Sequence, residues 1–470
     1  MPARSSAAAA AGLAAATAVL ALLVLSGTLP LAGYSTITSL AGFLGLVAAG
    51  YLAWHVEPAW MLTGALVLSC FNSNWDAFGL PPLVAPDRLL LAAGVLSLLL
   101  RAPRARRRPP LRLEPVHALL AAALAWAVGS ALAVGTITSA DTTFELLDRF
   151  AVPFMVFTLA PLAFRTRRDR EVFLAVIVAF GAYLGLTSLF EALGPHALVF
   201  PRFILDESIG YHVARARGPF LEASVNGIGL YSCLALSLVA AATWRESRWR
   251  RSAAQAVAFV CAMGLLFTLT RSVWLAAGIA TAATMVSARE LRRWLLPVAG
   301  AATVVIAALL VLLPAFDQQV AERRAAQWSV WERENVNAAA LAMTQQRPLT
   351  GFGLGTFNER NDEYFPLLDN TPQVAERRLG IHNVFLALST ELGLIGLTLF
   401  VLGMATAVGT ALRRRGPPEL RPWRHALLAI ALFWFVVANF APIGQVYPGM
   451  IVWLVAGIVL GATASAGDRQ

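Results

Sequence analysis

Apolar runs of about 20 residues recur along the whole chain and constrain its fold more than any other feature. Fourteen such runs cover residues 9–29, 35–54, 58–71, 84–100, 115–136, 146–164, 172–192, 220–243, 252–269, 272–288, 294–315, 384–411, 426–441 and 447–464. A helix of about 20 apolar residues crosses the hydrocarbon core of a bilayer, where only helices and closed barrels satisfy their backbone hydrogen bonds. We therefore predict an all-α polytopic membrane protein with about 14 transmembrane helices. Because run 58–71 is short and compatible with a re-entrant segment, 12 to 14 spans fit the pattern.

Clusters of arginine predict how these helices are oriented. They lie at residues 101–112, 165–170, 245–251, 289–293 and 413–424. With fourteen spans and a cytoplasmic N-terminus, all five clusters fall on the cytoplasmic side, where basic residues are enriched in short loops. The C-terminus is then cytoplasmic as well. This pattern accounts for the net charge of +10 without a nucleic-acid partner.

One long polar segment, residues 317–383, interrupts the series of apolar runs. It divides the chain into residues 1–316, with eleven predicted transmembrane helices and an outer loop at 194–218, the long outer loop itself, and the last transmembrane helices in 384–470. Residues 318–346 contain neither Pro nor Gly, so we predict a helix there that ends before Pro348. A loop of this size is usually a domain or a functional site.

Several arginines lie on the outer side of this topology, where the positive-inside rule makes them unexpected. Arg215 and Arg217 precede the turn at Gly218 and suit a phosphate or diphosphate, because guanidinium binds phosphate oxygens through two parallel hydrogen bonds. The alternative is anchoring to lipid headgroups. Arg271 lies between apolar stretches without an acidic neighbour, which favours a functional role as much as snorkelling to the headgroups.

Other outer arginines have simpler interpretations. Arg324 and Arg333 lie on the predicted loop helix, where a solvated helix face is the alternative to substrate binding. Arg88 and Arg149 each follow an aspartate, Asp87 and Asp148, so a local ion pair at a helix end is the favoured interpretation.

His382 and Asn383 end the long loop at the start of the next apolar run. Imidazole accepts a proton near neutral pH, so His382 is a candidate general base, and Asn383 is a candidate orienting partner. The alternative is a histidine that only starts a helix. The glycines of residues 351–355 do not follow a predicted strand, as the glycines of a nucleotide-binding loop would. The sequence also has no His cluster with the spacing of metal ligands. We predict no cofactor and no metal.

Three elements of the sequence together resemble the O-antigen ligase and O-antigen polymerase family of bacterial surface-glycan assembly. The first is Arg215-Ala-Arg217-Gly218-Pro219-Phe220 with Asn226. The second is Thr270-Arg271-Ser272, a partial match to a Ser-Arg-Gly helix start. The third is the loop, with Arg333, then Arg347-Pro348-Leu349-Thr350-Gly351-Phe352-Gly353, then His382-Asn383 and Glu391-Leu392-Gly393. The resemblance covers about residues 200–400.

This resemblance implies a membrane glycosyltransferase of the C type in the bacterial inner membrane, with a periplasmic active site. The donor would be a glycan on undecaprenyl diphosphate, and the enzyme would need no metal or nucleotide. Arg215, with Arg217 in reserve, and Arg333, with Arg324 in reserve, would bind the diphosphate, with Arg271 nearby. His382 would activate the acceptor hydroxyl.

The acceptor distinguishes members of the family. A ligase transfers the glycan to lipid A-core, which is the interpretation we favour, and a polymerase transfers it to another lipid-linked glycan. A transporter of small anions or lipid-linked glycans is the alternative of another class. It is disfavoured because transporters place ionisable residues near mid-membrane, whereas here they gather on one face.

Overall fold

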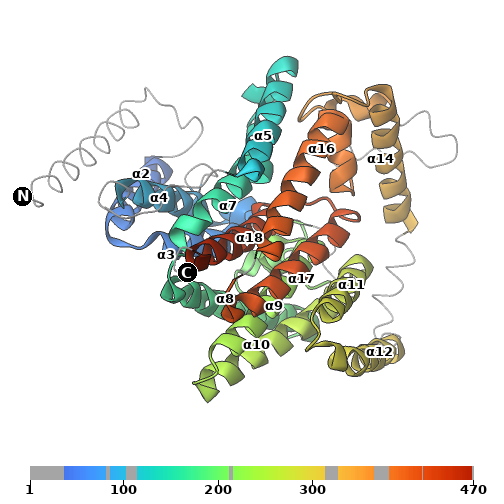
Figure 1. Cartoon of the computed structure of the whole chain (residues 1–470). Coiled ribbons are helices and arrows are strands. Elements are labelled where there is room, and N and C mark those ends of the chain that lie inside the picture. Colours follow the sequence, from blue (N-terminus) through green and yellow to red (C-terminus); the bar gives the residue numbers. More distant parts are fainter. Residues whose placement is uncertain are drawn as a thin grey trace, which may run out of the picture.

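The computed structural model describes residues 36–80, 85–101, 114–210, 215–312, 327–364, 380–414 and 416–467, and these residues form helices and connections without a strand (Figure 1). The α-helices are α2 Thr36–His55, α3 Pro58–Leu68, α4 Pro86–Arg101, α5 Pro115–Val134, α6 Ala140–Leu146, α7 Val152–Ala163, α8 Arg167–Leu193, α9 Ala223–Thr243, α10 Arg248–Phe267, α11 Arg271–Ser287, α12 Leu295–Leu312, α14 Gln327–Gln346, α15 Phe357–Arg360, α16 Val384–Arg413, α17 Arg421–Ala438 and α18 Val446–Gly467. Short 3-10 or π turns are η1 Ser69–Phe78, η3 Thr136–Thr138, η4 Leu147–Ala151, η5 His196–Leu198, η6 Arg202–Leu205, η7 Gly218–Phe220, η8 Arg292–Trp294, η10 Asn361–Glu363 and η12 Pro418–Leu420.

The helices follow the apolar runs closely. Every predicted run from 35–54 onward coincides with helical structure, and run 9–29 lies outside the described residues. Within the described residues, six helical segments are long and apolar enough to cross a membrane: Pro115–Val134, Ala140–Ala163, Arg167–Leu193, Ala223–Thr243, Val384–Arg413 and Pro418–Ala438. The chain thus has the architecture of a polytopic helical membrane protein, while the total of fourteen spans stays a prediction.

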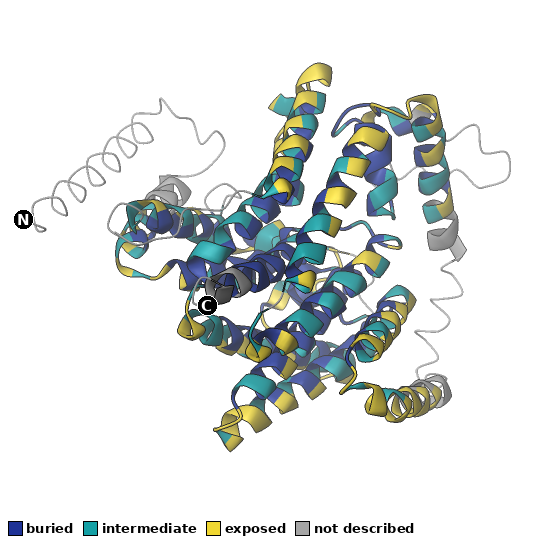
Figure 2. Cartoon of the chain, in the orientation of Figure 1, coloured by how far each residue is buried: buried dark blue, intermediate teal, exposed yellow. Residues whose placement is uncertain are grey.

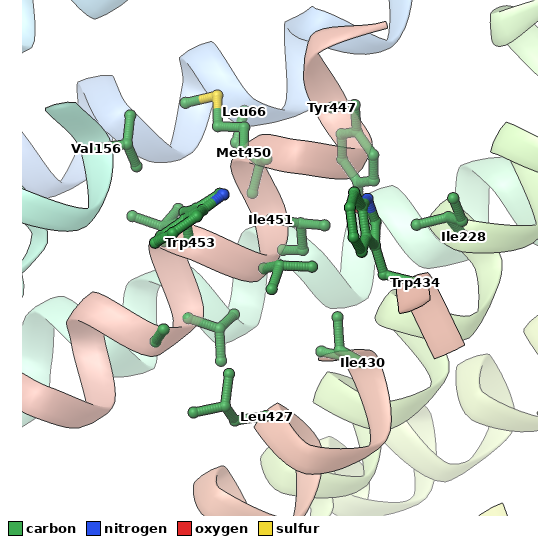
Figure 3. Packing of buried hydrophobic residues seen from close by; sticks show 14 of the residues in the cluster. Leu66, Val156, Ile228, Leu427, Ile430, Trp434, Tyr447, Met450, Ile451 and Trp453 are labelled. Carbon is green, nitrogen blue, oxygen red and sulfur yellow. The ribbon is translucent and has the colours of Figure 1, made fainter. Parts of the chain in front are cut away.

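Helix α18 forms the centre of the main hydrophobic core (Figures 2 and 3). The Trp453 ring packs edge-on against Phe154 of α7, with ring centroids 5.1 Å apart. Glycines allow the two backbones to approach: a β-carbon at Gly457 would lie 2.6 Å from the Phe157 carbonyl oxygen, and one at Gly461 would lie 2.5 Å from Pro161 Cα. Small residues at such contacts bring helices together where lipid removes most of the hydrophobic driving force.

Helix α14 is the longest described helix of the long loop, and it lies beside α16 (Figure 1). It ends at Gln346, two residues before Pro348, as the sequence predicts. The Thr390 hydroxyl of α16 donates to the Ala340 carbonyl oxygen of α14 at 3.0 Å. A small hydrophobic cluster that includes Met343, Phe352 and Ile381 fills the contact. The first part of the predicted helix, with Arg324, lies outside the described residues.

The glycine-rich segment after α14 docks against a break in α16. Gly393 has φ 67° and ψ −176°, which interrupts the helix. The amides of Phe352 and Gly353 donate to the carbonyl oxygens of Thr390 and Glu391 at 3.0 and 2.8 Å, and the amide of Leu394 donates to Pro348 at 2.7 Å. The glycine-rich segment of the long loop is therefore joined backbone to backbone to α16, the helix that follows the loop.

Arg88 and Arg149 form ion pairs, but not with the aspartates predicted from the sequence. Arg88 pairs with Asp148 at 3.1 Å, and Arg149 pairs with Glu145 one helical turn earlier. Asp87 accepts instead from the Trp75 indole at 2.7 Å. The prediction of adjacent pairs was wrong because neighbouring side chains on a helix point in different directions, whereas Arg88 can reach Asp148 on a neighbouring element.

Candidate functional site

The turn that carries Arg215 is held in place by its neighbours in the core. Asn226, inside α9, donates to the Ala216 carbonyl oxygen and to the Ser188 hydroxyl, each at 3.0 Å. The Ala216 amide donates to the Phe267 carbonyl oxygen at the end of α10, also at 3.0 Å. The two sequence elements around Arg215 and Asn226 thus form one unit, in which the asparagine fixes the backbone of the arginine turn.

Arg217 is fully buried, and its guanidinium is used within the protein. Its NH2 donates to the carbonyl oxygens of Ile204, at 2.8 Å, and Asp206, while its NH1 donates to that of Ile209. Burial lowers the pKa of Arg217, partly offset by nearby acidic groups. Arg217 therefore ties the 202–209 segment to the turn.

The backbone of this turn is bound by a carboxylate from the end of α8. Glu191 accepts from the amides of Arg217 and Gly218, each at 3.0 Å. Gly218 has φ 56°, and a β-carbon there would lie 2.6 Å from Asn226 Oδ1. Glycine is required at this position by both backbone conformation and space.

Glu222, directly before α9, lies near arginines from two different segments. Burial raises the pKa of the Glu222 carboxyl, and the positive charges of Arg333 and Arg215 oppose this rise. Arg333 belongs to α14, more than 100 residues away in the sequence. The structure therefore brings two of the predicted diphosphate ligands to one carboxylate.

His382 lies within the electrostatic reach of the same Arg333. Burial and the positive charge of Arg333 lower the pKa of His382 from 6.5 to about 4, so the imidazole is neutral at physiological pH. Its Nδ1 is buried and makes no hydrogen bond with any residue that the structure describes. The charges of Arg215 and Arg333 thus act on Glu222, and the charge of Arg333 also acts on His382.

Asn383 has a different role from the one predicted. Its side-chain oxygen accepts from the amides of Phe385 and Leu386 at 2.9 and 3.0 Å, which caps the N-terminus of α16. The cap fixes the backbone next to His382 rather than the imidazole itself. The Asn383 side chain accepts from backbone amides at the helix start that would otherwise lack an acceptor, and these hydrogen bonds fix the orientation of the side chain.

Arg271 is the first residue of α11 and is exposed. It follows the tight turn after α10, whose last residue, Phe267, binds the amide of Ala216. Arg271 and Arg215 thus lie on two turns that are hydrogen-bonded to each other. Arg324, the remaining predicted ligand, falls outside the described residues.

A comparison with protein families now bears on this arrangement. The segment from α10 to the middle of α16 contains Arg271, Arg333 and His382 together with the glycine-rich segment. Residues 256–401 match the O-antigen ligase family. The match confirms the resemblance to O-antigen ligases and polymerases, and Arg215 precedes the matched O-antigen ligase domain. No curated protein matches the chain.

Two acidic residues at this candidate site were not singled out from the sequence. Glu222 lies seven residues after Arg215, just beyond the arginine-rich predicted outer loop 194–218, and that local mixture of charges was the available signal. Glu191 lies at the end of an apolar run and binds backbone amides 26 residues away, for which the sequence holds no comparable signal.

Proposed function

We propose that this protein is a membrane glycosyltransferase that moves a glycan from undecaprenyl diphosphate to an acceptor hydroxyl at the periplasmic face of the bacterial inner membrane. The favoured acceptor is lipid A-core, which makes the protein an O-antigen ligase. The match to the O-antigen ligase family supports a ligase or polymerase. The observation that carries the proposal is the position of Arg333, whose charge acts on both Glu222 and His382.

The diphosphate is the leaving group of this reaction. When the bond between the sugar and the diphosphate oxygen breaks, negative charge develops on that oxygen and needs neutralisation rather than a proton. Arg215 and Arg333 are proposed to bind it, because the positive charges of both act on the Glu222 carboxylate and would attract another anion in the same way. Arg217 is proposed to hold the loop, since backbone carbonyls already occupy its guanidinium. Arg271 is proposed to assist from the adjoining turn.

The acceptor hydroxyl loses its proton as its oxygen bonds to the sugar. His382 is proposed to accept this proton, because its imidazole is neutral and its Nδ1 makes no hydrogen bond with a described residue. The lowered pKa keeps His382 in the neutral form that can accept a proton, but it also makes the imidazole a weaker base. The charges that set this pKa therefore affect catalysis as much as the imidazole does. Metal ions and nucleotides take no part in the proposed mechanism.

Genetics in the source organism and transfer by the purified protein test this proposal together. In a deletion strain, we expect lipid-linked glycan to persist and glycan-capped lipid A-core to disappear. Loss of long glycan chains, with single repeats still attached to lipid A-core, would instead indicate a polymerase.

Transfer from purified donor should continue in EDTA and without ATP. Loss of activity in EDTA that a divalent ion restores would contradict the metal-free mechanism.

A further inference from the structure

A charged cavity of about 450 Å³ is lined by none of the residues of the His382 site. Four arginines line it: Arg167 and Arg170 at the start of α8, Arg245 after α9, and Arg421 at the start of α17. They come from three of the clusters that the sequence predicts to be cytoplasmic. The structure therefore gathers separate clusters around one concave site instead of spreading them over a surface.

The charged side chains that line the cavity carry a net charge of +1. Three glutamates, Glu171, Glu290 and Glu419, also line it, which leaves one net positive charge when set against the four arginines. A single phosphodiester group carries one negative charge at neutral pH and would balance the cavity. Guanidinium is well suited to this group, because it pairs with two phosphate oxygens at once.

Two of the four arginines are already engaged within the protein. Arg167 pairs with Glu171 at 2.8 Å, and Arg170 donates to the carbonyl oxygens of Phe164 and Arg165 after the end of α7. These contacts shape the wall of the cavity.

The other two arginines retain donors for a ligand. Arg245 is exposed and uses only its Nε, which donates to the Ala242 carbonyl oxygen at 3.0 Å. Arg421 is exposed and makes no side-chain hydrogen bond or ion pair with another described residue. Arg245 and Arg421 are therefore the candidate ligands.

The position of the cavity indicates a lipid rather than a free anion. Helices α8, α9 and α17 are all apolar enough to span a membrane, and the cavity lies where they end. Its wall includes the buried side chains of Leu174, Leu420 and Trp423. A site with basic side chains and apolar walls at the end of membrane helices fits a headgroup together with the first part of its acyl chains.

We propose that this cavity binds the phosphodiester headgroup of an anionic phospholipid, such as phosphatidylglycerol, from the leaflet on the arginine-rich side, through Arg245 and Arg421. This lipid is distinct from the substrates at the His382 site, and its binding is independent of glycan transfer. Both arginines are exposed, so they can be replaced without disturbing the core.

Native mass spectrometry of the detergent-purified, delipidated full chain tests the proposal by titration with phosphatidylglycerol. Each arginine near an anionic lipid contributes about fivefold to binding, so the double variant Arg245→Gln/Arg421→Gln should bind this lipid on the order of 20-fold more weakly. The matched control is Arg292→Gln/Arg293→Gln. It removes two charges from an arginine cluster predicted to lie on the same side, at positions that do not line the cavity, and should bind like the wild type.

Two further titrations separate the possible ligands. Zwitterionic phosphatidylethanolamine should bind weakly to all variants, and millimolar inorganic phosphate should not displace phosphatidylglycerol. Equal loss of binding in both double variants, or no loss in either, would overturn the assignment to this cavity. Displacement by inorganic phosphate would overturn the assignment to a lipid, because it would show a site for free anions.

Discussion

The carbonyl oxygen of Leu349 lies only 2.1 Å from where a β-carbon at Gly393 would be placed. The positive φ of Gly393 and this close contact both exclude larger residues at the break in α16. The contact joins the glycine-rich segment to the helix that begins next to His382.

We expect Gly393→Ala to destabilise the protein by more than about 1–3 kcal/mol, the usual cost of a strained backbone residue, because steric overlap adds to that strain. Thermal unfolding in detergent and glycan transfer would measure the effect. Gly409→Ala is the matched control in the same helix, since a β-carbon there meets nothing within 4 Å. It should leave stability unchanged or raise it. Equal melting temperatures for both variants would contradict the proposed role of the break.

Removal of the imidazole should separate catalysis from donor binding. We expect His382→Gln to lower turnover by roughly 10²–10⁴, the usual contribution of a general base, while donor affinity stays near that of the wild type. His55→Gln, at the end of α2, controls for the general effect of losing a histidine. A well-expressed His382→Gln protein with normal transfer would remove His382 from the mechanism.

The proposed diphosphate ligands should respond differently from the base. Arg215→Lys and Arg333→Lys keep the charge but lose the paired donors, so both donor affinity and turnover should fall. Arg202→Lys is a suitable control, because Arg202 lies in the same predicted outer loop as Arg215 and, among the described residues, donates to the carbonyl oxygens of His196 and Ala197. Normal donor affinity in both Arg215→Lys and Arg333→Lys would exclude them as phosphate ligands.

Arg217 should behave as a structural residue. Arg217→Ala removes the donor to the carbonyl oxygens of Ile204, Asp206 and Ile209. The buried oxygen of Ile204, left unsatisfied, alone costs about 1–3 kcal/mol. We expect a large fall in thermal stability and expression. A variant as stable as the wild type that fails to bind donor would instead assign Arg217 to the substrate.

In the proposed mechanism, the pH dependence of kcat/KM should report the ionisation of His382 in the free enzyme. Because burial and Arg333 lower its pKa from 6.5 to about 4, activity should not decline through this group until the pH approaches 4. Arg333→Gln removes the second cause and should move the acid limb of its residual activity to higher pH. An acid limb at pH 6.5 in the wild type would contradict the buried environment of the imidazole.

The lowered pKa of His382 also makes the stability of the folded protein depend on pH. Between about pH 4 and 6.5 the unfolded chain binds this proton more tightly than the folded protein does. The stabilising contribution of neutral His382 is therefore present above pH 6.5 and is lost as the pH falls towards 4.

The positions of helices could be predicted well because apolar length is a local property of the sequence. Run 172–192 lies within α8, and Pro348 marks the end of α14 as expected. The match at residues 256–401 confirms the family resemblance found around Arg333 and His382.

The roles of individual polar side chains were harder to predict. Arg217 was grouped with Arg215, yet its partners are carbonyl oxygens of a loop 8 to 13 residues earlier, whose path is set by tertiary packing. Arg88 forms an ion pair with Asp148, which lies 60 residues later in the sequence. Such pairs depend on which helices are neighbours, and hydrophobic periodicity does not specify that.

The shared influence of Arg333 has a consequence for the order of events. Its charge now holds Glu222 towards the ionised form and His382 towards the neutral form. A bound diphosphate would offset that charge and strengthen the imidazole as a base. The acceptor would then be activated mainly while a donor is in place, which would disfavour proton abstraction in an empty enzyme and couple the two substrates without any movement of the helices.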